Sequence, residues 1–204
     1  MKGRHRILIA SSNPGKLAEI RSMLDLPIEL VGLEDFPGID EIEEDGQTFA
    51  ENARKKAIGY AMQTNLWTIA DDSGLMIDAL NGEPGVKSAR FAGVAGDRKF
   101  VDQKNIEKVL ELLKDVPKEK RKARFVCCLC MTSTTEILFE TQGILEGIIV
   151  DEPIGENGFG YDPIFFVPKL KKTVAQLTAE EKNRISHRGN AIRKLKLRLE
   201  QFLK

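Results

Sequence analysis

The chain has 204 residues, of which 42% are hydrophobic and 30% are charged. This length and balance allow one large domain or two lobes with a buried core, and they argue against disorder. Its 31 Lys and Arg residues equal its 31 Asp and Glu residues in number, so no overall positive charge draws it to nucleic acid or an anionic membrane. We therefore expect neither partner, and any anionic ligand must be held by a local cluster.

We expect neither an export signal nor a membrane-spanning helix. No apolar run approaches the roughly 18 residues that a membrane-spanning helix needs. The basic start at residues 1–6 is followed by an apolar run over only 7–10, which is too short for a signal peptide. The cysteines Cys127, Cys128 and Cys130 share one apolar run and do not suggest a disulfide scaffold. We expect them to be core residues of a protein in the reducing cytoplasm.

The first half of the chain alternates strands and helices. Apolar runs predict strands over 6–10, 27–33 and 68–71, and helical spacing predicts helices over 16–26, 48–63 and 98–113. Thr48 and Glu51 have the spacing of a capping box at the start of the second helix. The acidic stretch 34–46 is expected to be a loop, and 81–85 a turn.

The second half is richer in strands, which are predicted over 123–131, 136–139, 144–150 and 163–167. A glycine-rich loop covers 155–160, and the last helix is predicted over 186–204. This order favours an α/β fold with a mixed sheet flanked by helices. Because no linker rich in Pro, Gly or Ser divides the chain, we expect a single domain over 1–204, with two lobes and a central cleft.

The junction between the first strand and the first helix has residue types that suit an anion. It consists of Ser11, Ser12, Asn13, Pro14, Gly15 and Lys16. Backbone N–H groups at a helix start can hold an anion, and a lysine adds a positive charge. The alternative is an ordinary helix cap made by Ser12 or Asn13. The spacing is not that of a Walker A loop.

Acidic side chains gather at two places. Asp71 and Asp72 directly follow an apolar strand, where α/β sheets bind ligands, and adjacent acids are costly without a compensating cation or water. Adjacent strand residues point to opposite faces, so one acid could enter a site while the other braces a loop. The acidic loop at 41–45 would suit magnesium, which takes one or two carboxylates with waters and substrate phosphates. An acidic turn and a solvated loop are the plain alternatives.

Two later segments could recognise the rest of a ligand. Residues 158–163 alternate glycines with aromatic rings, which fits either a tight turn or bulge packed by rings, or a pocket where a ring stacks on a purine. His187 and Arg188 open the last helix, with Lys182 upstream. Because the helix dipole disfavours cations there, we expect an anion or an acidic partner nearby, and a structural salt bridge is the alternative.

Taken together, these segments resemble the inosine triphosphate pyrophosphatase family, also called the Ham1-like family, over nearly the whole chain. The resemblance rests on the order and spacing of short motifs rather than on any one of them. They are Ser-Ser-Asn-Pro-Gly-Lys at 11–16, Thr-Phe-x-Glu-Asn-Ala at 48–53, Ala-Asp-Asp-Ser-Gly-Leu at 70–75, Gly-x-Pro-Gly at 82–85, Ser-Ala-Arg-Phe at 88–91, Gly-Phe-Gly-Tyr-Asp-Pro at 158–163 and Ser-His-Arg-Gly at 186–189. Ser11 stands where many members carry Thr, and it keeps the hydroxyl.

The resemblance implies magnesium-dependent hydrolysis of ITP, dITP or XTP to the monophosphate and pyrophosphate, by a homodimer with a long, curved sheet. It implies that Asp72 is the general base and a metal ligand, that Glu43 is the second metal-binding carboxylate, and that Asp71 is a supporting acid. The substrate-binding residues that it implies are Ser11, Ser12, Asn13, Pro14, Gly15, Lys16, Ser73, Phe159, Gly160, Tyr161, Asp162, Lys182, His187 and Arg188.

Other functions remain open beside this one. A Maf-like pyrophosphatase would act on pyrimidine or modified nucleotides and need a different pocket. A nucleotide sensor without catalysis would not need the acids that suit a metal. A purely structural dimer module would leave the charged, glycine-rich loops without a reason.

Overall fold

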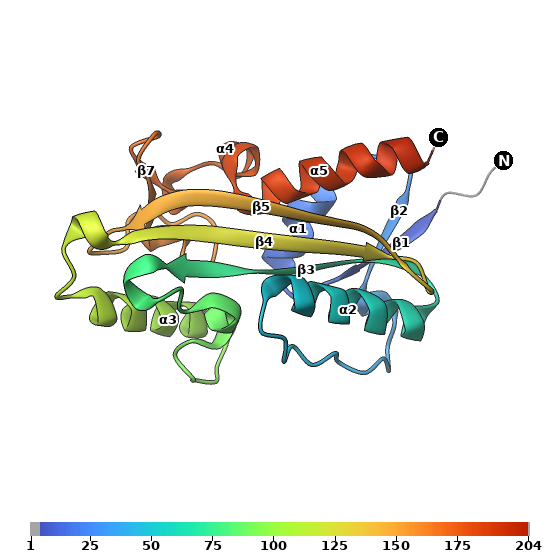
Figure 1. Ribbon diagram of the computed structural model, residues 1–204, viewed down its shortest axis with the longest axis horizontal. Helices are drawn as coiled ribbons and strands as arrows, with labels where there is room; N and C mark the ends of the chain where they lie inside the picture. The colour runs from blue at the N-terminus through green and yellow to red at the C-terminus, as the bar shows by residue number, and fades with distance from the viewer. Residues whose placement is uncertain (1–4, 204) are drawn as a thin grey trace. The chain divides into compact units, whose positions relative to one another are not determined.

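The computed structural model describes residues 5–203 (Figure 1). The start of the chain at 1–4, on which the expectation about a signal peptide partly rests, lies outside the described residues. The chain divides into two compact units. Unit 1 comprises Met1–Asp72, Cys127–Gly143 and Arg188–Lys204, and unit 2 comprises Ser73–Val126 and Ile144–His187. Each unit is therefore assembled from segments that are far apart in the sequence.

Seven strands form a mixed sheet in the order β2-β1-β3-β4-β5-β6-β7. The strands are β1 (Arg6–Ala10), β2 (Glu29–Gly32), β3 (Trp67–Ile77), β4 (Lys122–Thr132), β5 (Ile137–Ile149), β6 (Phe165–Val167) and β7 (Lys172–Thr173). Strand β1 pairs in parallel with β2 and β3, whereas β6 pairs antiparallel with β5 and β7. The mixed α/β sheet predicted from the sequence is confirmed.

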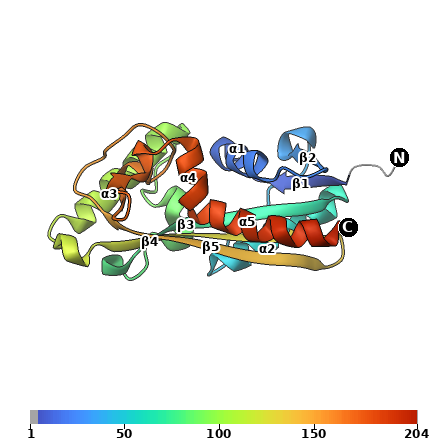
Figure 2. The ribbon, with the colours of Figure 1, turned by 90° about the horizontal axis from the view of Figure 1, so that it is seen from above.

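Unit 1 contains the helices α1 (Pro14–Met23), α2 (Phe49–Thr64) and most of α5 (His187–Phe202). Alternate strand residues such as Ile9, Ile69 and Leu129 pack with α1 and α5 in one hydrophobic core. Helix α2 and helix α5 lie on opposite sides of the unit 1 strands (Figures 1 and 2). The two faces of β3 in this unit therefore meet different helices.

Unit 2 has its own hydrophobic core. Helix α3 (Arg98–Leu113) contributes Val109, and strands β3, β4 and β6 contribute Leu75, Phe125 and Phe165. The short helix α4 (Ala179–Ile185) also belongs to this unit. Within residues 5–203, none of the helices combines the length and apolar character needed to cross a membrane.

Several predicted bounds need correction. The strand predicted over 68–71 continues to Ile77, so the acids at 71 and 72 lie inside β3 rather than after it. The strands predicted over 136–139 and 144–150 are one strand, β5, because the glycine between them stays extended. The final helix does not start at Ser186, whose backbone is extended (φ −65°, ψ 158°) and which ends α4.

Smaller differences concern proline and short apolar runs. The first helix begins at Pro14, whose fixed φ suits a helix start, and ends at Met23. The strand predicted over 27–33 shrinks to Glu29–Gly32, and that predicted over 163–167 begins at Phe165, after a single turn of 3-10 helix. The predicted bounds of β1 and α3 are confirmed, as is the Thr48 capping box.

Candidate active site

Asp71 is the centre of a buried ionic cluster in unit 1. Its carboxylate is 1% exposed and accepts hydrogen bonds from Lys16 Nζ, from Arg188 Nε at 3.0 Å and from the Cys127 thiol at 3.1 Å. Burial alone raises the pKa of Asp71, but Arg188, Lys16 and Lys56 together hold it well below its usual range. Asp71 therefore stays ionised and fixes the first turns of α1 and α5 against β3.

Asp72 faces the other way, toward α2. It is 5% exposed, and its Oδ2 accepts a hydrogen bond from Asn52 Nδ2 at 3.0 Å. Burial raises the pKa of Asp72 to about 6, although the charges of Lys56 and Lys16 act in the opposite direction. The predicted division of the two acids between opposite faces of the strand is confirmed. A carboxylate that titrates near neutral pH has the property that a general base needs.

Lys56 is a buried cation that sequence reasoning missed. This α2 residue is 8% exposed, and its Nζ donates to Glu44 Oε1 at 2.9 Å and to the Asp71 carbonyl oxygen at 2.6 Å. Burial lowers the pKa of Lys56, but Glu44, Asp72 and Asp71 raise it more. The sequence feature that points to Lys56 is its spacing of four residues from Asn52, which puts both side chains on one face of the helix.

The acidic loop supplies a second source of carboxylates. Glu44 is half-buried and paired with Lys56, whereas Glu43 is exposed. Among residues 5–203, no three His, Cys, Asp or Glu side chains form a ready-made metal cluster. Magnesium needs only one or two carboxylates beside waters and phosphates. Asp72 is a hard oxygen donor, and the raised pKa shows that its neighbours do not fully offset the cost of its charge. These residues fit magnesium, and Glu43 as its ligand stays a prediction.

The segment at 11–16 forms a helix cap. Asn13 Oδ1 accepts hydrogen bonds from the backbone N–H groups of Gly15 at 3.0 Å and Lys16 at 3.3 Å. Ser11 Oγ in turn accepts from Asn13 N at 3.2 Å. The cap alternative is thus confirmed with Asn13 as the capping residue, while phosphate binding by Ser11, Ser12 and their neighbours stays a prediction.

In unit 2, the aromatic segment closes into a turn on Asp162. The Asp162 Oδ2 atom accepts from Phe159 N at 2.9 Å and from Lys182 Nζ at 2.6 Å. The same ammonium lies 4.3 Å from the centroid of the Phe159 ring. Gly158 has a φ of +79°, and a Cβ there would come within 2.1 Å of Asp162 Oδ2. The turn interpretation is confirmed, and the purine pocket stays a prediction.

The neighbouring residues of this turn are anchored to the rest of unit 2. The Gly160 N–H donates to Asp102 Oδ2 of α3, and the Tyr161 hydroxyl donates to the Ser88 carbonyl oxygen, both at 2.8 Å. Burial raises the pKa of Tyr161, so it is a neutral donor. His187 is buried and stacks on the Phe125 ring at 4.8 Å between centroids. Tyr161 is therefore an anchor rather than a free ring.

The other predicted residues have simple environments. Arg188 pairs with Asp71 and with Glu19 of α1, which confirms the expected acidic partner and the salt-bridge alternative. Ser73 is half-buried in β3. Sequence reasoning missed Asn52, Glu19 and Asp102, because their roles depend on contacts with distant segments.

Comparison with known proteins identifies the family. The Ham1 family profile matches residues 7–198. The chain belongs to the Ham1 family. One relative of this Ham1 chain, the dITP/XTP pyrophosphatase of Bacillus cereus, is 47% identical over 205 residues, which cover 99% of the chain and 98% of the relative. The dITP/XTP pyrophosphatase of Listeria monocytogenes is 50% identical over 191 residues, covering 93% and 92%.

Solved structures agree with this family assignment. The Ham1 protein of Staphylococcus aureus matches with a TM-score of 0.85 and 45% identity, over 96% of this chain and 98% of that one. A HAM1 protein from Coxiella burnetii matches with a TM-score of 0.87 and 44% identity, over 97% and 99%. The fold of the Ham1 family is therefore the fold of this chain, as the sequence resemblance predicted.

Proposed function

We propose that this chain is a hydrolase acting on acid anhydrides, which converts the non-canonical purine nucleotides dITP, XTP and ITP to the monophosphate and pyrophosphate. Relatives that align with nearly the whole chain carry the name dITP/XTP pyrophosphatase. The observation that carries the proposal is Asp72, a buried carboxylate with a pKa of about 6 in a cluster of lysines and acids.

Asp72 acts in this proposal as the general base. It accepts a proton from the water whose oxygen bonds to the α-phosphorus. The bond from that phosphorus to the oxygen bridging to the β-phosphate breaks, and pyrophosphate leaves. General-base assistance of this kind typically contributes about 10²–10⁴-fold to the rate. Lys16, held by Asp71, offsets negative charge on the phosphates.

Magnesium belongs to the same proposal. Asp72 and an acid of the loop, Glu43 or its neighbour Glu44, would hold the ion. When bound, magnesium neutralises phosphate charge and makes the phosphorus more electrophilic. The donor types and the burial of Asp72 support this assignment.

Base recognition is assigned to residues of unit 2, namely Phe159, Gly160, Asp162, Lys182 and His187. Inosine and xanthine carry a carbonyl oxygen at position 6, where adenine carries an amino group. Donors such as the His187 ring or a backbone N–H pair with that oxygen, and against adenine they lose their partner at about 1–3 kcal/mol per group. The enzyme should therefore hydrolyse ATP less efficiently than ITP or XTP.

The proposal extends to a homodimer in the cytoplasm that removes such nucleotides from the precursor pool. The free state of all three cysteines supports a reducing compartment. Sedimentation equilibrium of the full chain tests the dimer, since a single species of monomer mass would contradict it.

A nucleotide panel tests the activity. The full chain is incubated with dITP, XTP, ITP, dATP, GTP and TTP, with magnesium or with EDTA, and products are separated by anion exchange. We expect monophosphate and pyrophosphate from the first three, and none in EDTA. Similar rates on all six, or diphosphate and phosphate as products, would contradict the proposal. A preference for pyrimidine nucleotides would favour the Maf-like alternative, and binding without turnover would favour a sensor.

A further inference from the structure

Asn52 has no role in the function proposed above, yet it is 0% exposed and uses both ends of its side-chain amide. Its Oδ1 accepts a hydrogen bond from the Gly46 N–H at 2.8 Å. Its Nδ2 donates to Asp72 Oδ2 at 3.0 Å. The amide therefore joins the end of the acidic loop to the carboxylate on β3.

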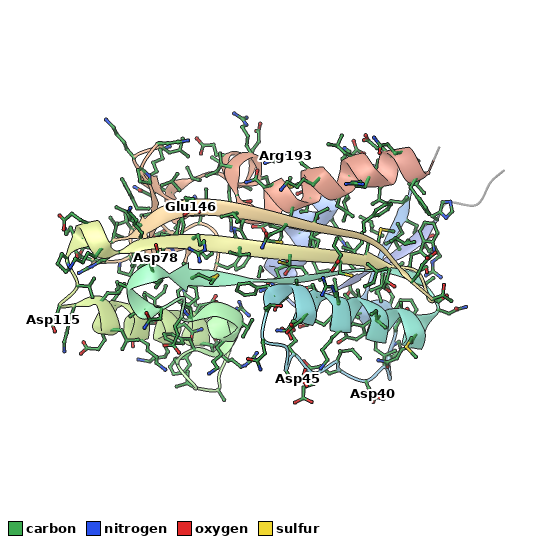
Figure 3. The ribbon with its side chains drawn as sticks, viewed as in Figure 1. Asp40, Asp45, Asp78, Asp115, Glu146 and Arg193 are labelled. Carbon is green, nitrogen blue, oxygen red and sulfur yellow. The ribbon has the colours of Figure 1, made fainter. Side chains whose placement is uncertain are left out.

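The acidic loop and the residues that flank it, Asp40 and Gly46, run alongside α2 and make several hydrogen bonds and ion pairs with it. Gln63 exchanges two hydrogen bonds with the Asp40 backbone, at 2.7 and 3.0 Å. Lys56 pairs with Glu44, and Lys55 pairs with Asp45. Figure 3 labels Asp40 and Asp45, and it shows this stretch running alongside α2. Asn52 differs from these residues because its second hydrogen bond reaches Asp72.

Gly46 permits the contact with Asn52. A Cβ at this position would lie 2.6 Å from Asn52 Oδ1 and 2.9 Å from Glu51 Cβ, so a side chain there would force the loop away from the helix. Glu51 Oε2 also accepts from the Gln47 N–H at 2.7 Å and the Thr48 N–H at 3.2 Å. Residues of the motif at 48–53 thus hold the end of the loop against the start of α2 by hydrogen bonds.

We propose that Asn52 is a positioning residue that couples the acidic loop to Asp72, and so fixes the two carboxylate sources for a divalent ion relative to each other. The identity of the ion and of the substrate rests on the function proposed above. Outer partners of metal-binding carboxylates typically contribute about 10–100-fold to metal affinity or activity. We expect an effect of that size.

Three variants separate the two hydrogen bonds. Asn52→Ala removes both. Asn52→Asp keeps an acceptor for the Gly46 N–H, but it replaces the donor to Asp72 with a repelling carboxylate. Gly46→Ala keeps the Asn52 amide and displaces the loop. Gln63→Ala is the matched control, because it removes a clamp between the same loop and the same helix and makes no contact with Asp72.

The readouts are Mn²⁺ affinity by electron paramagnetic resonance without nucleotide, kcat and KM for dITP, and amide hydrogen exchange over residues 41–48. Asn52→Ala should bind Mn²⁺ about 10–100-fold more weakly, lose kcat by a similar factor with KM within about threefold, and speed exchange in the loop. Gly46→Ala should also speed exchange and weaken Mn²⁺ binding. Asn52→Asp should lose kcat while the loop stays protected. Gln63→Ala should keep wild-type Mn²⁺ affinity and kcat.

The proposal is overturned if folded Asn52→Ala keeps wild-type Mn²⁺ affinity and kcat, or if Gln63→Ala loses as much. Should Asn52→Ala fail to fold, Asn52→Asp and Gly46→Ala decide the question by the same readouts. A wild-type chain that hydrolyses none of the purine nucleotides refutes the proposed function. In that event Mn²⁺ affinity and hydrogen exchange still decide the role of Asn52.

Discussion

Two adjacent carboxylates show how strongly local partners set the chemistry of a residue. Asp71 is surrounded by Arg188, Lys16 and Lys56, and its pKa is held well below the usual range. Asp72 is also buried, but there burial outweighs the opposing charges of Lys56 and Lys16, and its pKa is raised to about 6. One acid is thus a permanent anion that positions cations, and the other can exchange a proton near neutral pH.

The raised pKa of Asp72 predicts a stability cost. Its folded-state value of about 6 lies above the ordinary 3.8, so stability falls as pH rises between these values. In the presence of a chelator, Asp72→Asn should be more stable than wild type at pH 8, by on the order of 3 kcal/mol, and equal to it at pH 4. Urea unfolding at both pH values measures this. Turnover should drop by about 10²–10⁴-fold. A stability difference that does not change with pH, or wild-type turnover, would count against the assignment.

The cysteines give a second prediction at this scale. Burial raises the pKa of Cys128 to about 11 and that of Cys130 to about 12, and it raises the pKa of Cys127 well above its ordinary value. Because the thiolate is the reactive form, the folded protein at pH 8 should react very slowly with a disulfide reagent. All three thiols should react in denaturant. Rapid reaction of a thiol in the folded chain would show that its strand is more open than described.

At the scale of elements, periodicity predicted most helices and strands but not the extent of β3. The residues Asp71-Asp72-Ser73-Gly74 favour a turn by their intrinsic propensities, because Asp and Gly are poor strand formers. They stay in the strand since Lys16 and Arg188 pair with Asp71 across 55 and 117 residues of sequence. The roles of Asn52 and Lys56 are hard to predict for the same reason: their spacing places them on one face of α2, but it does not reveal the distant residues that they contact.

Strand β5 offers a test of packing within unit 2. A Cβ at Gly147 would lie 2.4 Å from Phe165 Cε1 and 2.5 Å from the Phe166 carbonyl oxygen, so the strand pair β5–β6 has no room for a methyl group. Gly147→Ala should lower the stability of the fold by about 1–3 kcal/mol. The adjacent change Glu146→Ala, at an exposed position labelled in Figure 3, is the control and should have little effect. Equal melting temperatures for both variants would contradict this account.

At the scale of the molecule, each unit has its own hydrophobic core, and both cores draw on β3, β4 and β5. The sequence predicted a two-lobed α/β fold, because no linker interrupts it and strands dominate its middle. It did not reveal which segments join which unit, because that depends on the packing of α5 on β1 and β3 rather than on their distance along the chain.

Unit 1 is assembled from segments that are far apart in the sequence, and this has a consequence for its synthesis. Asp71 lies in β3, in the first half of the chain, whereas Arg188 belongs to α5. While a ribosome is still translating the middle of the message, the nascent polypeptide holds the acid without its guanidinium and β1 without α5. The Asp71–Arg188 pair, and with it the core of unit 1, can therefore form only after α5 has left the exit tunnel.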